Sequence, residues 1–277
     1  MKKLFKTIIC LALALVMCFG LTACGEFSGS FKTIASADEV NAAFAKVSSN
    51  IGKVDTESGY QIKATFEGAL EDEFSIGELS FSIKGDINTS VSGKVSIKDG
   101  VKSSLESKTT VSGISNPLPN TTINFNYVSD VATYADDVAM YTNSVTNMNG
   151  IEEKSKTKVN FDTDVQSVIG SFMMIVSENV EGVSFFSFTG AQLKTEGVLV
   201  YIDSSGKGTK IKFEFDDTNK GNRSVFGKGT AIYSFGANNL LRGYWMDYEL
   251  QGLKIFVELK PYNGSVKLPS DLDTYEG

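Results

Sequence analysis

The chain has 277 residues, a length typical of one large domain or two small ones. It carries 26 basic and 33 acidic residues, and this net charge of −7 does not suit a surface that neutralises nucleic-acid phosphates. Histidine is absent, which removes the commonest general base, the commonest metal ligand and every nucleophile pair that uses histidine. Hydrophobic residues make up 42% of the chain, as in an ordinary globular protein.

The first six residues include three lysines, and an apolar run follows from Ile8 to Leu21. This run of roughly 14 residues is shorter than the ~20 residues that a membrane-spanning helix needs. A basic start, a short apolar core and small residues before a cleavage point are typical of a secretory signal peptide. We therefore predict that residues 1–23 are removed during export.

The signal peptide ends in Leu21-Thr22-Ala23-Cys24, which resembles a bacterial lipobox. The resemblance implies cleavage between Ala23 and Cys24 and acylation of Cys24, so the protein would be extracytoplasmic and lipid-anchored to the bacterial cell membrane. An ordinary signal peptide followed by a chance cysteine is the alternative. Cleavage would leave no second cysteine for a disulfide, and 23 basic against 33 acidic residues, a net charge of −10. Acyl chains would then have to supply the attachment to anionic membranes.

Residues 24–36 are rich in Gly and Ser after Cys24, and this composition predicts a flexible tether. No linker divides the remainder, so we predict a single domain over residues 37–277. Its first helix is marked by Ser36 and Glu39, which have the spacing of a capping box. Apolar residues then recur on one helical face up to Gly52, namely Val40, Ala43, Phe44, Val47 and Ile51.

The helix is followed by segments in which apolar and polar residues alternate, beginning with Tyr60–Glu67. This period of two predicts antiparallel strands with one solvated face. Turn signals separate the segments, as in Lys98-Asp99-Gly100 and Asp203–Gly208. We expect ten to twelve strands, which include the following segments: 79–97, 101–111, 123–127, 198–202, 211–215, 230–235, 241–250 and 253–259.

A second helix is expected over residues 163–178, where one helical face is apolar. That face consists of Val165, Val168, Ile169, Phe172, Ile175 and Val176, and Met173 and Met174 widen it. We predict a mainly β (α+β) fold with a single highly curved antiparallel sheet, an unclosed half-barrel, and both helices packed on its concave apolar face. Ten strands offer on the order of thirty inward side chains, more than two helices cover, so the sheet would enclose an apolar hollow.

This order of lipobox, capped helix, strands, mid-chain helix and strands resembles the LolA-like lipoprotein carriers, which include LppX-type lipoproteins. The segment Val266–Tyr275 also resembles the Leu/Ile-Pro-x-Asp-Leu ending of small lipoproteins with this fold. The resemblance implies a half-barrel whose cavity receives lipid chains. Candidate residues lining such a cavity are Phe44, Val168, Phe172, Met173 and Val176, although apolar helical faces more often fill a core.

Other motifs favour structural interpretations over chemistry. Phe185, Phe186 and Phe188 suit either a core or a cavity wall, and Trp245 with its neighbouring tyrosines suits a sheet face more than a ligand platform. Gly206–Thr209 lacks the spacing of a phosphate loop, and Asp217–Gly221 lacks the ligand run of a calcium loop. The adjacent acids Asp136-Asp137 and Glu71-Asp72-Glu73 do not face each other as glycosidase carboxylates do.

The sequence thus predicts a non-enzymatic, membrane-anchored lipoprotein that binds or carries a lipid or another hydrophobic molecule. No cofactor, metal or nucleic acid is expected as a partner. The alternative is a structural or interaction lipoprotein at the cell surface, with a filled core and a protein partner that the sequence does not identify.

Overall fold

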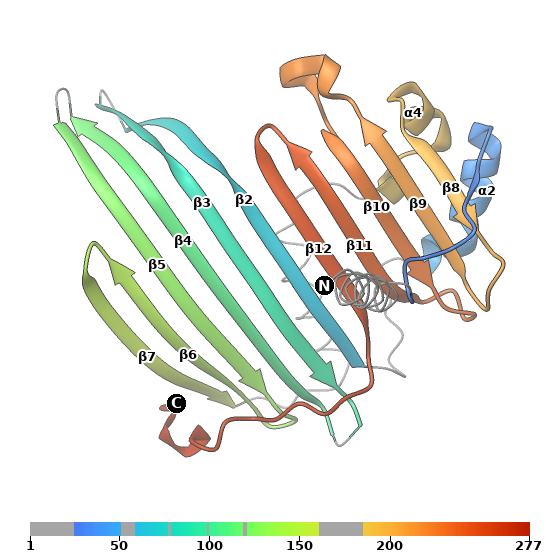
Figure 1. Cartoon of the computed structure of the whole chain (residues 1–277). Coiled ribbons are helices and arrows are strands. Elements are labelled where there is room, and N and C mark those ends of the chain that lie inside the picture. Colours follow the sequence, from blue (N-terminus) through green and yellow to red (C-terminus); the bar gives the residue numbers. More distant parts are fainter. Residues whose placement is uncertain (1–24, 51–58, 77–78, 99, 119–120, 161–184) are drawn as a thin grey trace, which may run out of the picture.

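The computed structural model describes residues 25–50, 59–76, 79–98, 100–118, 121–160 and 185–277. In these ranges twelve strands form one antiparallel sheet in the order β1-β8-β9-β10-β11-β12-β2-β3-β4-β5-β6-β7 (Figure 1). The strands are β1 (Lys32–Thr33), β2 (Gly59–Ile76), β3 (Leu79–Ser96), β4 (Lys102–Leu118), β5 (Thr121–Ala135), β6 (Ala139–Met148), β7 (Ile151–Asn160), β8 (Leu199–Asp203), β9 (Thr209–Asp216), β10 (Lys228–Phe235), β11 (Leu241–Leu250) and β12 (Leu253–Tyr262). The predicted fold class, a curved and unclosed antiparallel sheet, is confirmed.

The first predicted helix is α2 (Ala37–Val47), which a 3₁₀ turn, η1 (Ser48–Asn50), extends. Its capping box forms as the sequence predicts, since the Glu39 backbone N–H donates to the Ser36 hydroxyl and the Ser36 N–H donates to the Glu39 carboxylate. A second short helix, α4 (Gly190–Thr195), packs against α2. The remaining 3₁₀ turns are η2 (Phe185–Ser187), η3 (Thr218–Arg223) and η4 (Leu272–Thr274).

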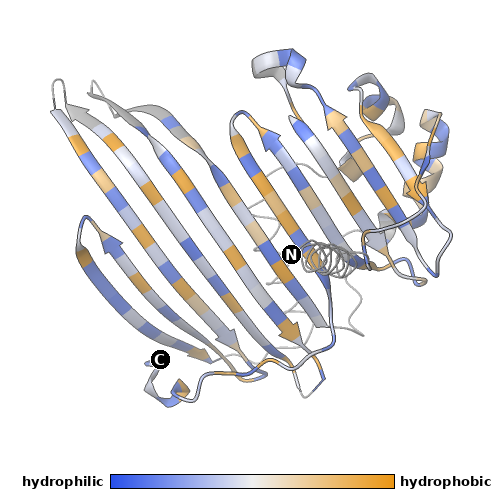
Figure 2. Cartoon of the chain, in the orientation of Figure 1, coloured by the Kyte–Doolittle hydropathy of each residue, from blue (hydrophilic) through white to orange (hydrophobic). Residues whose placement is uncertain are grey.

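The sheet has two chemically different faces, because alternate residues of a strand point to opposite sides. We call the face that carries α2 and α4 the inner face. Phe44 of α2 contacts the ring of Phe213 there, and the strand register assigns every other strand residue to one face or the other. Figure 2 shows apolar and polar residues alternating along most strands, as the sequence predicts.

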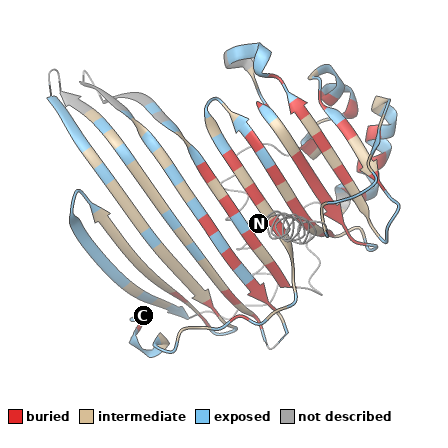
Figure 3. Cartoon of the chain, viewed as in Figure 1, coloured by how far each residue is buried: buried red, intermediate tan, exposed pale blue. Residues whose placement is uncertain are grey.

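The hydrophobic core lies on the inner face of β8–β12 and β2, which we call the covered half of the sheet (Figure 3). Its centre is a group of aromatic rings, in which Phe185 stacks on Phe213 with ring centroids 4.3 Å apart. Phe186 meets Tyr233 edge-on at 4.7 Å, and Phe185 and Phe213 are fully buried. We call β3–β7 the open half, because most of its residues are half-buried or exposed (Figure 3).

Both ends of the described chain wrap the sheet. Residues 25–36 do not behave as the flexible tether that the sequence predicts, since β1 pairs with β8 and the preceding residues hydrogen-bond to the strands. At the opposite edge, Glu276 exchanges backbone hydrogen bonds with Lys156 and Lys158 of β7. The predicted helix over residues 163–178 lies outside the described residues. None of the described helices has the length and apolar character needed to span a bilayer.

Candidate functional site

The inner face of the open half is almost free of charge. Among the described side chains of β3–β7, the register places a single charged residue on this face, Glu153 of β7. Lysines, aspartates and the other glutamates of these strands lie on the outer face, where Lys108 pairs with Asp130 and Lys84 with Glu71, each at 3.4 Å. A solvated sheet face normally carries the charged residues, so this distribution is unusual for a surface that meets water.

Large apolar side chains are exposed on the same inner face. They come from three neighbouring strands: Ile123 of β5 is 47% exposed, Met148 of β6 is 58% exposed, and Ile151 and Val159 of β7 are 72% and 51% exposed. Phe125 and Val131 of β5 lie on this face too and are half-buried. Within β3–β7, a single exposed large apolar residue, Ile114, points the other way. Several large apolar side chains exposed on one sheet face mark a binding site more often than a single exposed one does.

Hydroxyl groups fill the spaces between the apolar side chains. Thr89 of β3 and Thr109 of β4 face each other with their hydroxyl oxygens 3.2 Å apart. Further inner-face hydroxyls follow on the next strands, at Ser107, Ser129, Thr133, Thr142, Ser144 and Thr146. The resulting surface is weakly polar but uncharged, a chemistry that accepts an apolar molecule without burying an ionised group.

Of the predicted lining residues, Phe44 is the one that lies within the described ranges. Phe44 is 7% exposed and its ring lies 4.8 Å from that of Phe186, so it is part of the packed core under α2 and does not reach the open half. Val168, Phe172, Met173 and Val176 lie outside the described residues, as do Ala23 and Cys24. The sequence analysis did not single out Met148, Ile151 and Val159, because the alternation in β6 and β7 is too weak to reveal these strands.

A second candidate is a hollow of about 370 Å³ on the outer face, between residues 26–30 and the ends of β8–β11. Its two acids are already engaged. The Glu26 carboxylate accepts from the Ser234 hydroxyl and lies 3.9 Å from the Arg242 guanidinium. Asp203 accepts from the hydroxyl and backbone N–H of Ser205 and from the backbone N–H of Ser30, and these hydrogen bonds lower the pKa of its carboxyl. The contacts around this hollow therefore attach the N-terminal segment to the sheet.

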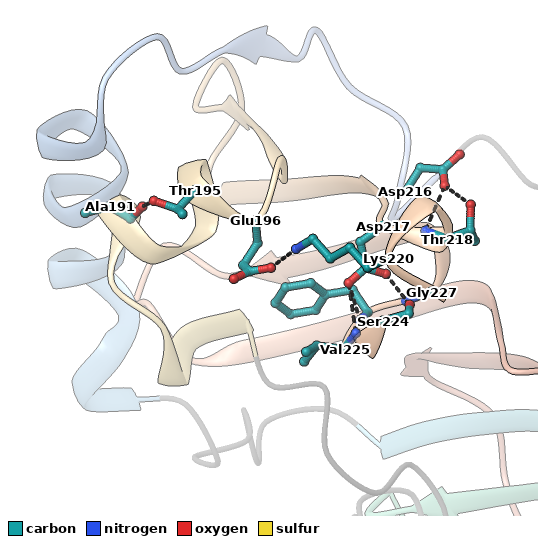
Figure 4. Close-up of polar contacts among 11 residues, drawn as sticks. Ala191, Thr195, Glu196, Asp216, Asp217, Thr218, Lys220, Ser224, Val225 and Gly227 are labelled. Carbon is teal, nitrogen blue, oxygen red and sulfur yellow. Dashed lines mark hydrogen bonds and ion pairs between the residues drawn. The ribbon is translucent and has the colours of Figure 1, made fainter. Parts of the chain in front are cut away.

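Asp217 organises the loop between β9 and β10 (Figure 4). It is 1% exposed, and its carboxylate accepts from the Ser224 hydroxyl and from the backbone N–H groups of Val225 and Phe226. Burial alone would raise the pKa of Asp217, but these hydrogen bonds together lower it. In the same loop, Lys220 forms an ion pair with Glu196. Asp217 thus holds the loop by hydrogen bonding, and in the described ranges no group of acidic residues is arranged to hold a metal ion.

The other motifs have structural roles. Phe185 is a core residue, with Phe186 and Phe188 packed beside it. Gly206–Thr209 joins β8 and β9 as a hairpin turn. Asp136 accepts from the backbone N–H groups of Val138 and Ala139 and so fixes the β5–β6 turn. Tyr244 is buried in the core, where desolvation raises its pKa, whereas Trp245 lies on the outer face and meets the ring of Phe256 at 6.4 Å.

The chain matches no protein-family model, and no curated protein matches it. Among solved structures it is similar to a β-barrel-like protein of the DUF1849 domain from Brucella abortus. The TM-score is 0.27 at 8% sequence identity, and the alignment covers 74% of this chain and 98% of that one.

Proposed function

We propose that this protein is a membrane-anchored lipoprotein that binds or carries a lipid or another hydrophobic molecule on the inner face of β3–β7. The observation that carries the proposal is the nearly complete absence of charge on that face, together with the exposure of Ile123, Met148, Ile151 and Val159. Covering apolar surface contributes about 25 cal/mol per Å², so an acyl chain laid along several strands would be held without any charged contact.

The mode of binding would be non-covalent and non-enzymatic. Methionine and phenylalanine adapt to irregular apolar shapes, and Met148 and Phe125 both lie on the proposed face. The hydroxyls between them could pair with ester or hydroxyl groups of a ligand. Such a surface selects an uncharged, extended molecule by burial, and Glu153 at the β7 edge is the one described side chain on it that would disfavour an anionic group.

The LolA-like and LppX-type resemblance is consistent with this proposal. The capped helix α2, the curved antiparallel sheet and the lipobox at Cys24 occur in the order that the resemblance implies. Acylation of Cys24 after export would place the domain at the outer side of a bacterial cell membrane. The resemblance concerns the carrier architecture.

The first test is native mass spectrometry of residues 25–277 purified without detergent, followed by organic extraction. We expect an additional lipid-sized mass that extraction removes and that returns when the lipid is added back. A clean mass for the polypeptide, unchanged by added lipids, would contradict the carrier proposal and favour the alternative of a protein partner on the same face.

A matched pair of variants locates the site. Met148→Glu places a charge on the inner face of β6, and Asn147→Glu places the same charge on the outer face one residue away. Both positions are near the end of the β6–β7 hairpin, and the Asn147 Oδ1 accepts from the Gly150 N–H in the turn, so Asn147→Glu should disturb the hairpin at least as much as Met148→Glu does. We expect Met148→Glu to lose most of the bound lipid and Asn147→Glu to retain it. Equal retention by both variants would place the ligand elsewhere.

A further inference from the structure

The N-terminal segment is bound to the outer face of the covered half. The Lys210 ammonium donates to the backbone oxygen of Ser28, and Glu26 contacts Ser234 and Arg242. The Ile34 N–H then donates to the Val200 oxygen at the sheet edge. Every strand partner named here belongs to β8–β11, so the segment crosses these strands before it reaches α2 on the inner face.

Two glycines allow this close approach. A Cβ atom on Gly243 would lie 3.0 Å from the Glu26 Cγ and 3.1 Å from a ring carbon of Phe27, and a Cβ on Gly29 would collide with the Asp203 carboxylate. Phe31 is held by the Lys212 ammonium, 5.3 Å from its ring centroid. The chain just after Cys24 is therefore fixed in position, and its attachment point is close to Gly243.

Aromatic residues surround this attachment point. Phe27 contacts Gly243, and Trp245 follows Gly243 by two residues on the same face of β11. Phe256 of β12 meets Trp245 edge-on. We call Phe27, Trp245 and Phe256 the anchor patch; all three are half-buried, so part of each ring reaches the surface. Tryptophan favours the headgroup level of a bilayer, and phenylalanine is among the apolar residues that interfacial segments bury there.

Charge at this place does not oppose contact with a membrane. Near the anchor patch Lys260 pairs with Glu258 at 3.0 Å, Lys212 pairs with Glu214 at 2.7 Å, and Arg242 faces Glu26. Lys207 and Lys210 balance Asp203 and the nearby Asp247 by formal charge. Local charge is thus close to neutral, whereas the chain after residue 23 has a net charge of −10.

We propose that the outer face around the anchor patch lies on the surface of the lipid bilayer, with Trp245 at headgroup level. This proposal rests on the acylation of Cys24 in the proposed function. Cys24 precedes Phe27 by three residues, a span of at most about 11 Å, so acyl chains at Cys24 enter the bilayer beside the patch. A flexible tether would leave the domain free to rotate, whereas the bound segment fixes which face meets the membrane. At these strands the inner face then points away from the bilayer.

The protein carries a built-in reporter for this test, because Trp245 is its one tryptophan. The chain from residue 24 onward has Cys24 as its one cysteine, which can be coupled to a maleimide phospholipid. We would place the coupled protein in phosphatidylcholine vesicles that contain brominated lipids and confirm attachment by flotation. We expect the Trp245 emission to shift to the blue, to be quenched by the brominated lipids and to be protected from aqueous iodide.

A relocated tryptophan provides the control. In Trp245→Phe combined with Asn143→Trp, the reporter moves to the outer face of β6, far along the sheet from the attachment point. We expect little quenching there. Equal quenching at both positions, or none at Trp245 in protein that floats with the vesicles, would overturn the proposal. Gly29→Val, which clashes with Asp203, should release the segment and reduce quenching of Trp245.

The outcomes separate this proposal from the carrier function. Trp245 quenching with no lipid-sized mass in the native spectrum would support the membrane-facing patch and contradict the carrier. A bound lipid on the inner face with an unquenched Trp245 would support the carrier and overturn the patch. Absence of acylation in cells, seen from the mass of the exported protein, would contradict the anchor itself, while the vesicle measurement would still decide the geometry.

Discussion

The covered and open halves are continuous parts of one sheet, yet their inner faces meet different surroundings. In the covered half, Phe213 and Met246 are fully buried beneath helices and aromatic rings. In the open half, Met148 and Ile151 occupy equivalent inner positions and are mostly exposed. Since the described side chains give neither inner face the many charges expected of a solvated surface, the difference lies in what covers them. In the proposed function, the bound ligand covers the open half as the helices cover the other half.

The largest expected effect is a difference in stability loss when one aromatic ring is removed from each half. Phe213→Ala deletes a fully buried ring that stacks on Phe185, and we expect it to lower the free energy of unfolding by about 3–5 kcal/mol. Phe125→Ala removes a half-buried ring from the inner face of β5. It should cost under about 1.5 kcal/mol, because little packing surrounds it. Urea unfolding of both variants measures the difference, and equal losses would mean that the two halves are equally packed.

The second prediction concerns acid sensitivity in the covered half. Asp217→Asn preserves size but replaces a carboxylate that accepts three hydrogen bonds by an amide, and it should cost about 1–3 kcal/mol at neutral pH. The pKa of Asp217 is lowered in the folded protein. Its stabilising contribution is therefore present above the unfolded pKa, about 3.9, and is lost as the pH falls through the lower folded pKa.

Unfolding curves at neutral pH and near pH 3 check this sign. The wild-type protein should lose stability between the two conditions, and Asp217→Asn should lose less, because the carboxylate is already gone. Asp247→Asn is the control, since Asp247 is an exposed aspartate on the outer face of β11. If Asp217→Asn loses as much stability between neutral pH and pH 3 as the wild type does, Asp217 does not contribute to this pH dependence.

The sequence predicts the covered half better than the open half for a physical reason. Strong alternation in Ile211–Phe215 and a capping box at Ser36 arise from local burial and hydrogen bonding, so local patterns reveal them. In β6 the apolar residues fall on both faces, and in β7 the apolar residues are Ile151 and Val159 near its two ends, so the period of two is lost. The nearly charge-free inner face becomes visible once the register aligns the strands, because it is a property of five strands together.

The N-terminal segment also shows that local sequence patterns do not reveal contacts between distant segments. Gly and Ser after Cys24 predict a flexible chain, but Gly29 and Gly243 are sites of close approach between segments distant in sequence. Composition alone does not distinguish a glycine that makes the backbone flexible from a glycine whose missing side chain lets two segments approach closely. The proposed site residues Val168, Phe172, Met173 and Val176 lie outside the described residues, so their role stays a prediction.

The smallest expected effect is at the far edge of the open half, where the C-terminal residues cover part of β7. The ring of Tyr275 meets that of Tyr141 edge-on at 5.7 Å, and the Lys156 ammonium lies 5.2 Å from the Tyr275 ring centroid. Beside them, the Lys158 N–H donates to the Glu276 oxygen at 2.6 Å. Tyr275→Ala removes an aromatic pair worth about 0.5–1.5 kcal/mol, and the edge should loosen while the core is unaffected.

Hydrogen exchange distinguishes this local opening from a global one. In Tyr275→Ala the Lys158 amide should exchange faster, because its acceptor at Glu276 is no longer held, whereas amides of β9 and β10 should keep their protection. Uniformly faster exchange through both halves would mean that the C-terminal residues stabilise the entire sheet. Local exchange confined to β7 would instead show that the open half can change at its edge without disturbing the core.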